Sequence, residues 1–141
     1  RNHGASLSTK EWLLFCEADD FFNPRVFEVF ERFKTPIDMI TTSEVAVSLT
    51  IDDTTHLKEI IAELEAFGSV ELDEDQAIVC IVGSMVSETE GVAVKLFESL
   101  KEVPVRMISY GGSKHNISVL IDEKYKQKAL QSLNDGLFTF E

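Results

Sequence analysis

Apolar and polar residues follow two different periods along the chain, and each period predicts one kind of element. Within residues 45–51 every second residue is a large apolar one, which predicts a strand with one buried face. Apolar residues spaced three or four apart in 26–33 predict a helix that begins at the Asn23-Pro24 pair and ends before Pro36. By the same reasoning, further strands are expected at 11–17, 37–41, 69–72, 76–82, 105–109, 115–121 and 137–140, and further helices near 54–67, 92–100 and 123–134.

The order of the expected elements is βαββαβ, and this order occurs twice. Val47–Asp52 (VSLTID) is similar to Ile117–Asp122 (ISVLID), and Pro36–Ile40 (PIDMI) is similar to Pro104–Ile108 (PVRMI). Two similar copies in the same order are better explained by duplication than by chance. We therefore expect two small domains of the same fold.

A βαββαβ unit forms a four-stranded antiparallel sheet with both helices on one face, which is the ferredoxin-like fold. The expected fold class is therefore α+β, with two such units. We place the first unit at residues 10–74 and the second at 75–141, and we interpret residues 1–9 as a linker or the remnant of an upstream strand. Because a unit of this size is marginally stable alone, we expect the two copies to pack together.

Composition and charge exclude several classes of partner. The 141 residues include 13 Lys and Arg against 25 Asp and Glu, which gives a net charge of −12. This charge argues against a nucleic acid or an anionic membrane surface as partner, because both attract a positive face. No apolar run has the length of a membrane span, and we expect no secretory signal because no basic segment precedes an apolar stretch. Both cysteines, Cys16 and Cys80, lie in apolar runs, so we expect buried, reduced thiols and a cytoplasmic protein.

No pattern in the sequence predicts catalysis or a metal site. Neither a phosphate-binding P-loop nor a dinucleotide-binding glycine motif is present, and Gly111-Gly112 reads as a turn between two strands. The three histidines, His3, His56 and His115, are scattered without a second ligand at metal-binding spacing. We therefore expect no catalytic residue, no metal ligand and no cofactor in this chain.

A polar segment between two expected strands is the best candidate for binding. Asp38–Glu44 (DMITTSE) combines two carboxylates with three hydroxyls, and residues 19–23 lead into a helix N-terminus, whose free amides attract a carboxylate. In a ferredoxin-like unit these two segments are neighbours. Together they suit a free amino acid, and the excess of acidic groups favours a basic one. A hairpin with solvated polar residues is the simpler alternative, and the residues alone leave both readings open.

These same residues resemble a known family. Asp38–Asp52 is similar to the first ACT domain of monofunctional, lysine-sensitive aspartokinases, and Arg106–Ser118 is similar to the second ACT domain of that family. The resemblance extends from about Leu13 to Phe138. It implies the C-terminal regulatory region of an enzyme that phosphorylates aspartate. The kinase domain, with its ATP and Mg²⁺, would then lie upstream, and this chain would not catalyse alone.

The resemblance also implies an effector site and partners. By position, the lysine contacts of the family correspond to seven residues here: Asp38, Thr42, Ser43, Glu44, Asp19, Phe22 and Asn23. Asp38 and Glu44 would bind the amines of the ligand, and amides near Phe22 and Asn23 its carboxylate. The implied partners are lysine, a second copy of the chain joined through the ACT domains, and the upstream kinase domain. The alternative is a pair of ACT domains that dimerises or binds a protein without a small ligand.

The family also places one strand of the second unit just before the first unit. Arg1-Asn2 is similar to the end of that strand, so we expect most of it to be missing. The sheet of the second unit would then have an unpaired edge or pair with a neighbouring chain.

Overall fold

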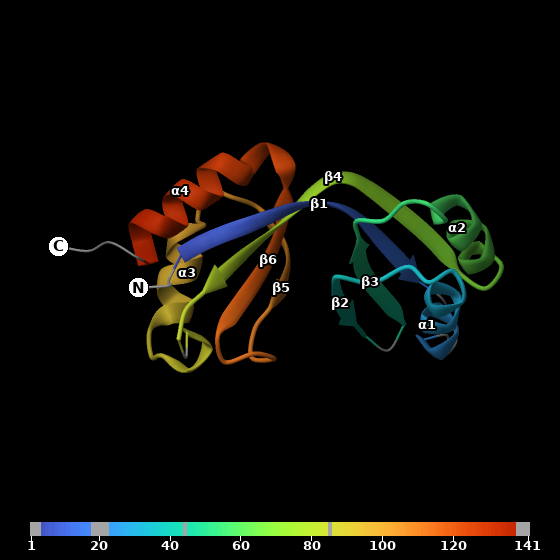
Figure 1. Ribbon diagram of the computed structural model, residues 1–141, viewed down its shortest axis with the longest axis horizontal. Helices are drawn as coiled ribbons and strands as arrows, with labels where there is room; N and C mark the ends of the chain where they lie inside the picture. Colours follow the sequence, from blue (N-terminus) through green and yellow to red (C-terminus); the bar gives the residue numbers. More distant parts are fainter. Residues whose placement is uncertain (1–3, 18–22, 44, 85, 138–141) are drawn as a thin grey trace. The chain divides into compact units, whose positions relative to one another are not determined.

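A computed structural model of the chain describes residues 4–17, 23–43, 45–84 and 86–137 (Figure 1). The strands are β1 (Gly4–Glu17), β2 (Met39–Thr42), β3 (Ala46–Ile51), β4 (Ser69–Val82), β5 (Val105–Ser109) and β6 (Asn116–Asp122). The helices are α1 (Asn23–Arg32), α2 (Leu57–Glu65), α3 (Val92–Ser99) and α4 (Lys126–Leu137), with short 3₁₀ helices η1 (Val86–Glu88) and η2 (Glu123–Tyr125). No helix in this part of the chain is long and apolar enough to cross a membrane.

The chain forms an α+β fold with antiparallel strand pairs, as expected, and it divides into two compact units. The N-terminal unit comprises residues 11–74, and its strands follow the order β2-β3-β1-β4. The C-terminal unit comprises residues 4–10 with 75–137, and its strands follow the order β1-β4-β6-β5. Each unit has two helices on one side of its strands (Figure 1).

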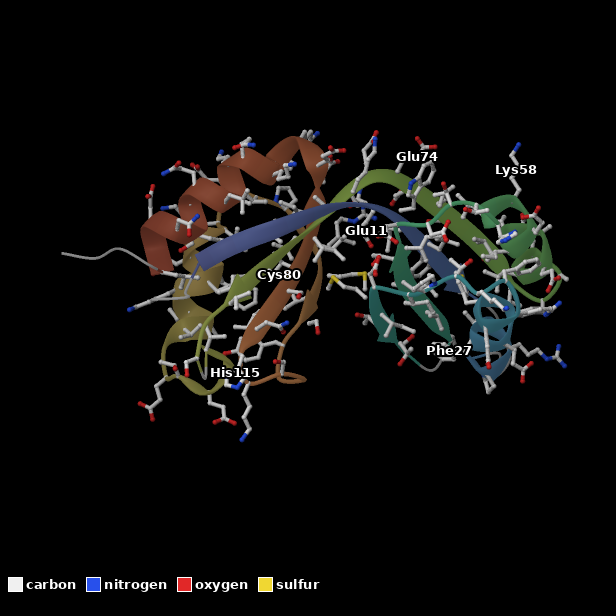
Figure 2. The ribbon with its side chains drawn as sticks, viewed as in Figure 1. Glu11, Phe27, Lys58, Glu74, Cys80 and His115 are labelled. Carbon is white, nitrogen blue, oxygen red and sulfur yellow. The ribbon has the colours of Figure 1, made fainter. Side chains whose placement is uncertain are left out.

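The core of the N-terminal unit lies between its strands and helices α1 and α2. Alternate residues of β3 are fully buried, as the period of two predicted, and they pack with Phe30 of α1 and Ile60 of α2. The other buried members of this core are Leu14, Cys16, Val26, Val29, Val47, Leu49, Ile51, Leu57 and Leu64. Charged side chains such as Lys58 of α2 point away from it (Figure 2). The helical and strand periods thus direct one apolar face of each element into a single core.

The core of the C-terminal unit repeats this arrangement with α3 and α4. Val79 and Ile81 of β4 pack with Ile117 of β6, Leu96 of α3 and Leu133 of α4. β6 pairs with both β4 and β5, and both pairings are antiparallel. Each unit therefore has its own hydrophobic cluster.

Strand β1 corrects the expectation for the start of the chain. Residues 4–9, interpreted as a linker or a strand remnant, form the first part of β1. Residues 4–10 group with the C-terminal unit, where β1 lies beside β4. The strand that we expected to be mostly missing is thus supplied by this chain, and β4 has a neighbour on that edge.

Strand β4 also differs from the expectation. Residues 69–72 and 76–82 were expected as two strands, but Ser69–Val82 is continuous. The acidic run Asp73-Glu74-Asp75 resembles a turn in sequence, whereas its backbone continues alongside β1. Asp75 has a left-handed backbone with φ of 56°, which is uncommon for a residue other than glycine. The last expected strand, 137–140, is not formed at Leu137, which ends α4, and its other residues lie outside the described part.

Candidate functional site

The register of the N-terminal unit brings the C-terminal ends of β1 and β2 to the same end of its sheet. Val47 of β3 lies opposite both Cys16 of β1 and Thr42 of β2. β1 and β2 therefore end at the same end of the sheet, on either side of β3. Asn23 is the first residue of α1. Residues 19–22 lie outside the described part, so the expectation that they are neighbours of the turn stays a prediction.

Ser43 closes the turn between β2 and β3. Its backbone N–H donates to the carbonyl oxygen of Ala46 at 2.8 Å, and its hydroxyl oxygen accepts from the N–H of Ala46 at 3.2 Å. Thr42 is exposed beside it at the end of β2. Ser43 thus shapes the turn through its own hydrogen bonds, and Thr42 presents its side chain at the surface of the same end.

Several predicted site residues lie outside the described part of the structure. Asp19, Phe22 and Glu44 are among them, and of Asn23 only the backbone is described. Their assignment as ligand contacts remains a prediction.

Asp38 lies at the opposite end of β2 from Thr42 and Ser43. At about 3.3 Å per residue, the four residues from Asp38 to Thr42 span roughly 13 Å. The backbone N–H of Asp38 donates to the carbonyl oxygen of Thr50 at 2.9 Å, and that of Met39 donates to the Thr50 hydroxyl oxygen at 3.0 Å. The structure therefore does not bring Asp38 next to the turn; it places this carboxylate farther along the same edge.

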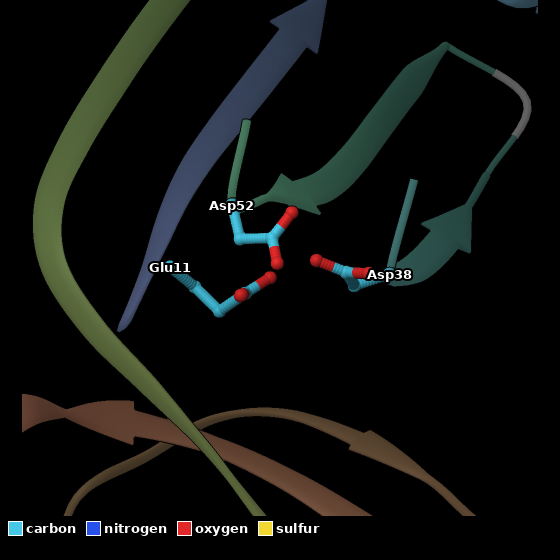
Figure 3. Close-up of side chains that lie close together, drawn as sticks. All are labelled: Glu11, Asp38 and Asp52. Atoms are coloured by element: carbon cyan, nitrogen blue, oxygen red, sulfur yellow. The ribbon is translucent and has the colours of Figure 1, made fainter. Parts of the chain in front are cut away.

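At that position Asp38 joins two other carboxylates, Glu11 and Asp52. One oxygen of each side chain lies within 4.8 Å of the others (Figure 3). Glu11 is buried, whereas Asp38 and Asp52 are exposed. Such a cluster attracts cations, including ammonium groups, but an acidic cluster alone does not assign a metal ion.

Sequence reasoning missed Glu11 and Asp52 as neighbours of Asp38. The three residues are distant along the chain and become adjacent only because Trp12 pairs with Ile51 and Met39 pairs with Thr50. Glu11 at the start of an apolar strand was the one available signal, since a charged residue is seldom buried without a partner.

The contact between Thr50 and Met39 gives a testable prediction. Thr50→Val keeps the shape of a fully buried side chain but removes the acceptor of the Met39 N–H, so we expect a loss of about 1–3 kcal/mol in unfolding free energy. Urea denaturation measures this loss. Ser48→Val, on the same strand and half-buried, is the control and is expected to change stability by less. Equal stability of Thr50→Val and wild type would contradict the role of this hydrogen bond.

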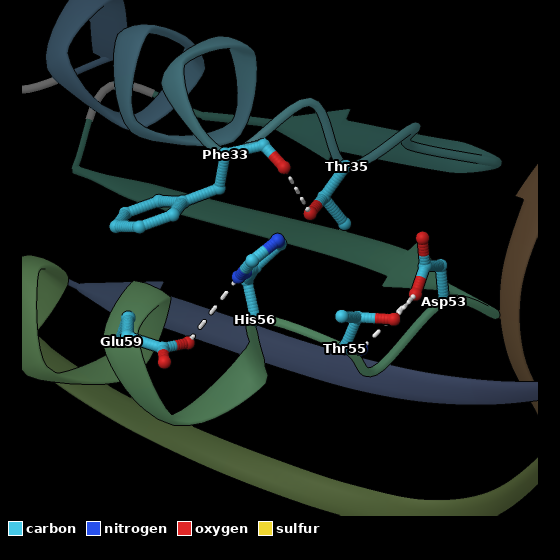
Figure 4. Close-up of polar contacts among 6 residues, drawn as sticks. All are labelled: Phe33, Thr35, Asp53, Thr55, His56 and Glu59. Carbon is cyan, nitrogen blue, oxygen red and sulfur yellow. Dashed lines mark hydrogen bonds and ion pairs between the residues drawn. The ribbon is translucent and has the colours of Figure 1, made fainter.

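The segment before α2 separates two acidic residues that are adjacent in sequence. Asp52 belongs to the carboxylate cluster, whereas Asp53 accepts hydrogen bonds from the Thr55 hydroxyl at 2.6 Å and the Thr55 N–H at 3.0 Å (Figure 4). These bonds hold the pKa of Asp53 below its ordinary value. The N-cap residue of α2 is His56, whose side chain makes no capping bond. Asp53 instead stabilises the turn that precedes α2.

Thr55→Val is expected to raise the pKa of Asp53 toward the ordinary value of about 3.9. Because the folded-state pKa is depressed, the contribution of Asp53 to stability is present above that ordinary value and is lost as the pH falls through the folded-state pKa. An NMR titration of the Asp53 carboxyl measures the shift. Thr54→Val, which removes a neighbouring hydroxyl, is the control, and an unchanged Asp53 pKa in Thr55→Val would refute this cause.

Both cysteines are free, but only Cys16 is buried as expected, whereas Cys80 is half-buried. Cys16 is buried in the core of the N-terminal unit, and burial raises its pKa to about 11. Cys80 is half-buried, with its sulfur 3.4 Å from the Ser118 hydroxyl. Cys16 is therefore protonated and unreactive at neutral pH.

Comparisons with known proteins identify the family. An ACT domain model matches residues 79–137. A candidate C-terminal regulatory domain of aspartate kinase from Porphyromonas gingivalis is 38% identical, with a TM-score of 0.84 over 97% of this chain and 98% of that chain. The chain belongs to the regulatory regions of aspartate kinases. Lysine-sensitive aspartokinase 3 of Escherichia coli is 35% identical over 83% of this chain.

The match to longer relatives is partial. The chain covers 28% of the Escherichia coli protein and 23% of the aspartokinase of Schizosaccharomyces pombe, so it spans about a quarter of the length of these curated relatives. A structure of Escherichia coli aspartokinase III in complex with lysine and aspartate (T-state) is 30% identical, with a TM-score of 0.81 over 99% of this chain and 34% of that chain. This regulatory region is therefore similar in fold to the same part of a lysine-bound enzyme.

Proposed function

We propose that the chain is the lysine-sensing module of an aspartate kinase, with two tandem ACT domains and one effector site in the N-terminal unit. The observation that supports this proposal is the register that brings Thr42, at the end of β2, to the end of the sheet where β1 also ends before the segment that precedes α1. The solved relative that contains lysine supports the choice of effector.

Each end of the ligand meets a different part of the site. The first amides of α1 are free of helical partners and carry partial positive charge, so they suit the carboxylate of an amino acid. Asp38 and Glu44 are the anchors for its amines, and the cluster of Glu11, Asp38 and Asp52 adds negative potential along β2. Because Asp38 lies well away from the turn, a long side chain with a terminal ammonium fits better than that of threonine or aspartate.

Inhibition then follows from differential affinity. The intact enzyme would contain an upstream kinase domain that uses ATP and Mg²⁺ to phosphorylate aspartate. Lysine must bind the inhibited arrangement more tightly than the active one, because otherwise it does not shift the equilibrium between the two. A coupling free energy of about 1–3 kcal/mol is typical of such regulation. In this way lysine, as the end product of lysine biosynthesis, would reduce the rate at which the enzyme phosphorylates aspartate.

Dimerisation is the second function that an observation favours. β2 is at the edge of its sheet. Ile40 within this strand is 41% exposed, and Val45, which precedes β3, is 46% exposed. An edge strand with unpaired backbone groups and neighbouring apolar side chains is suited to pairing with another copy. We propose a homodimer through the N-terminal unit, with or without ligand.

Calorimetry of the chain with lysine tests the effector, and threonine, methionine and aspartate serve as controls. The proposal predicts heat with lysine alone, at about one site per chain. Heat with threonine or methionine but not with lysine would show that the effector is that amino acid and not lysine. The absence of binding heat with all four amino acids would favour the alternative, a dimerisation module without a small ligand.

A further inference from the structure

The sheet of the N-terminal unit has two edges. In its strand order β2-β3-β1-β4, the outer strands are β2 and residues 69–74 of β4. All seven residues of β6 pair with 76–82, which begins beyond the end of this segment. Within the described part of the chain, 69–74 therefore has β1 on one side and an edge on the other. An edge of this kind can add a strand from another molecule.

The β4 edge carries exposed carboxylates. Val70 and Leu72 pack against the core of the unit, so Glu71 and Asp73, which alternate with them, lie on the opposite face of the sheet. Both acidic residues are exposed, and so is the adjacent Glu74. Three of the four residues in 71–74 are thus acidic and exposed.

The β2 edge has the opposite character. Its residues are Met39, Ile40, Thr41 and Thr42, none of them charged, and the last three are exposed. Isoleucine and threonine are β-branched, and such side chains suit a strand that has neighbours. Two copies that pair through β2 therefore bring uncharged side chains together.

Pairing through β4 would bring like charges together. In an antiparallel pair of two β4 edges centred on Leu72, Glu71 of each copy would lie opposite Asp73 of the other. Like charges directly opposite one another destabilise a strand pair. Pairing of β4 with β2 of a further copy would remove water from the same carboxylates without supplying a cation.

The charge of the whole unit adds to this repulsion. Residues 11–74 include 4 basic and 16 acidic side chains, which gives a net charge of −12. The remaining 9 basic and 9 acidic side chains of the chain balance one another. Contacts between two N-terminal units are therefore opposed unless they occur where the surface itself is uncharged, as along β2.

We propose that the carboxylates of residues 71–74 close the β4 edge to strand pairing, so that the N-terminal unit joins a second copy through β2 alone and assembly stops at the dimer. This inference rests on the proposed dimer and is independent of lysine binding. Two copies joined by their β2 edges form a closed pair. A copy with two competent edges would add further copies at β4 and form larger assemblies.

The mass of the 141-residue chain in solution, measured by sedimentation or light scattering, tests the inference. The double variant Glu71→Thr/Asp73→Thr removes two carboxylates from the edge and supplies side chains that favour strands. We expect its weight-average mass to exceed that of wild type by at least about twofold at equal concentration, because copies can then also add at β4.

Two further variants separate the edge from other effects. Glu28→Gln/Glu65→Gln removes two exposed carboxylates from α1 and α2, so it has the same change in net charge as the threonine variant without altering an edge. Glu71→Lys/Asp73→Lys changes the same edge positions but keeps like charges opposite one another. Both variants are expected to have the mass of wild type.

The outcomes separate this inference from the proposed dimer. A threonine variant with the mass of wild type would overturn the inference and leave the dimer intact. Larger assemblies of the helix variant or of the lysine variant would also overturn it, because the cause would then be net charge or altered local structure. A monomeric wild type would overturn the proposed dimer, and self-association of the threonine variant alone would even then support closure of the β4 edge.

Discussion

The Asp38→Asn variant is expected to bind lysine about 10- to 100-fold more weakly than wild type, because it loses a charge-assisted hydrogen bond to an ammonium group. The substitution keeps the size of the side chain. It also keeps the backbone bond from the Asp38 N–H to the Thr50 carbonyl oxygen, so the start of β2 should not move. Calorimetry of the variant with lysine measures the loss directly.

Asp53→Asn is the matched control for Asp38→Asn. It also removes one exposed carboxylate from the N-terminal unit, but Asp53 is engaged by Thr55 in the turn before α2. We expect its lysine affinity to remain close to that of wild type. Equal weakening in the two variants would indicate a general effect of negative charge, and unchanged affinity in Asp38→Asn would remove Asp38 from the site.

The largest effect on stability is expected from Phe30→Ala. Phe30 of α1 is 2% exposed and packs in the core of the N-terminal unit, so its removal leaves a cavity. Such a substitution typically costs about 3–5 kcal/mol, which is a large part of the total stability of a small unit. Trp12 is the single tryptophan and packs against the same core, so its fluorescence in urea reports on this unit.

Phe97→Ala is the matched control, because Phe97 is on α3, the corresponding helix of the C-terminal unit, and is 49% exposed. We expect it to leave the urea midpoint of the Trp12 signal nearly unchanged. A Phe30→Ala variant with the midpoint of wild type would contradict the assignment of Phe30 to the core.

The sequence predicted the elements whose own apolar and polar residues follow the period of a strand or of a helix. The alternation in Ala46–Ile51 identified β3, and the spacing of Val26 and Phe30 identified α1. β4 was predicted as two strands because Asp73-Glu74-Asp75 lacks apolar residues. Its continuity depends on pairing with β1, which is a property of the fold and not of the local sequence.

The site could be predicted in part for the same reason. The order of elements predicted that Thr42 and Ser43 lie near the start of α1, and the register does place Thr42 at the end of the sheet where β1 ends. The proximity of Asp38 to Glu11 and Asp52 depends on the register among three strands, which the sequence does not show. Asp38 was therefore grouped with the turn, although the structure places it with the carboxylate cluster.

An NMR titration of the ¹⁵N-labelled chain with lysine tests the central claim most directly, because it locates the ligand. The proposed site predicts that the largest amide shifts occur at Thr42, Ser43 and the first residues of α1, with a smaller change at Asp38. Shifts confined to the corresponding end of the C-terminal unit, at Gly83 and His115, would contradict this account, and so would saturating lysine that shifts no amide.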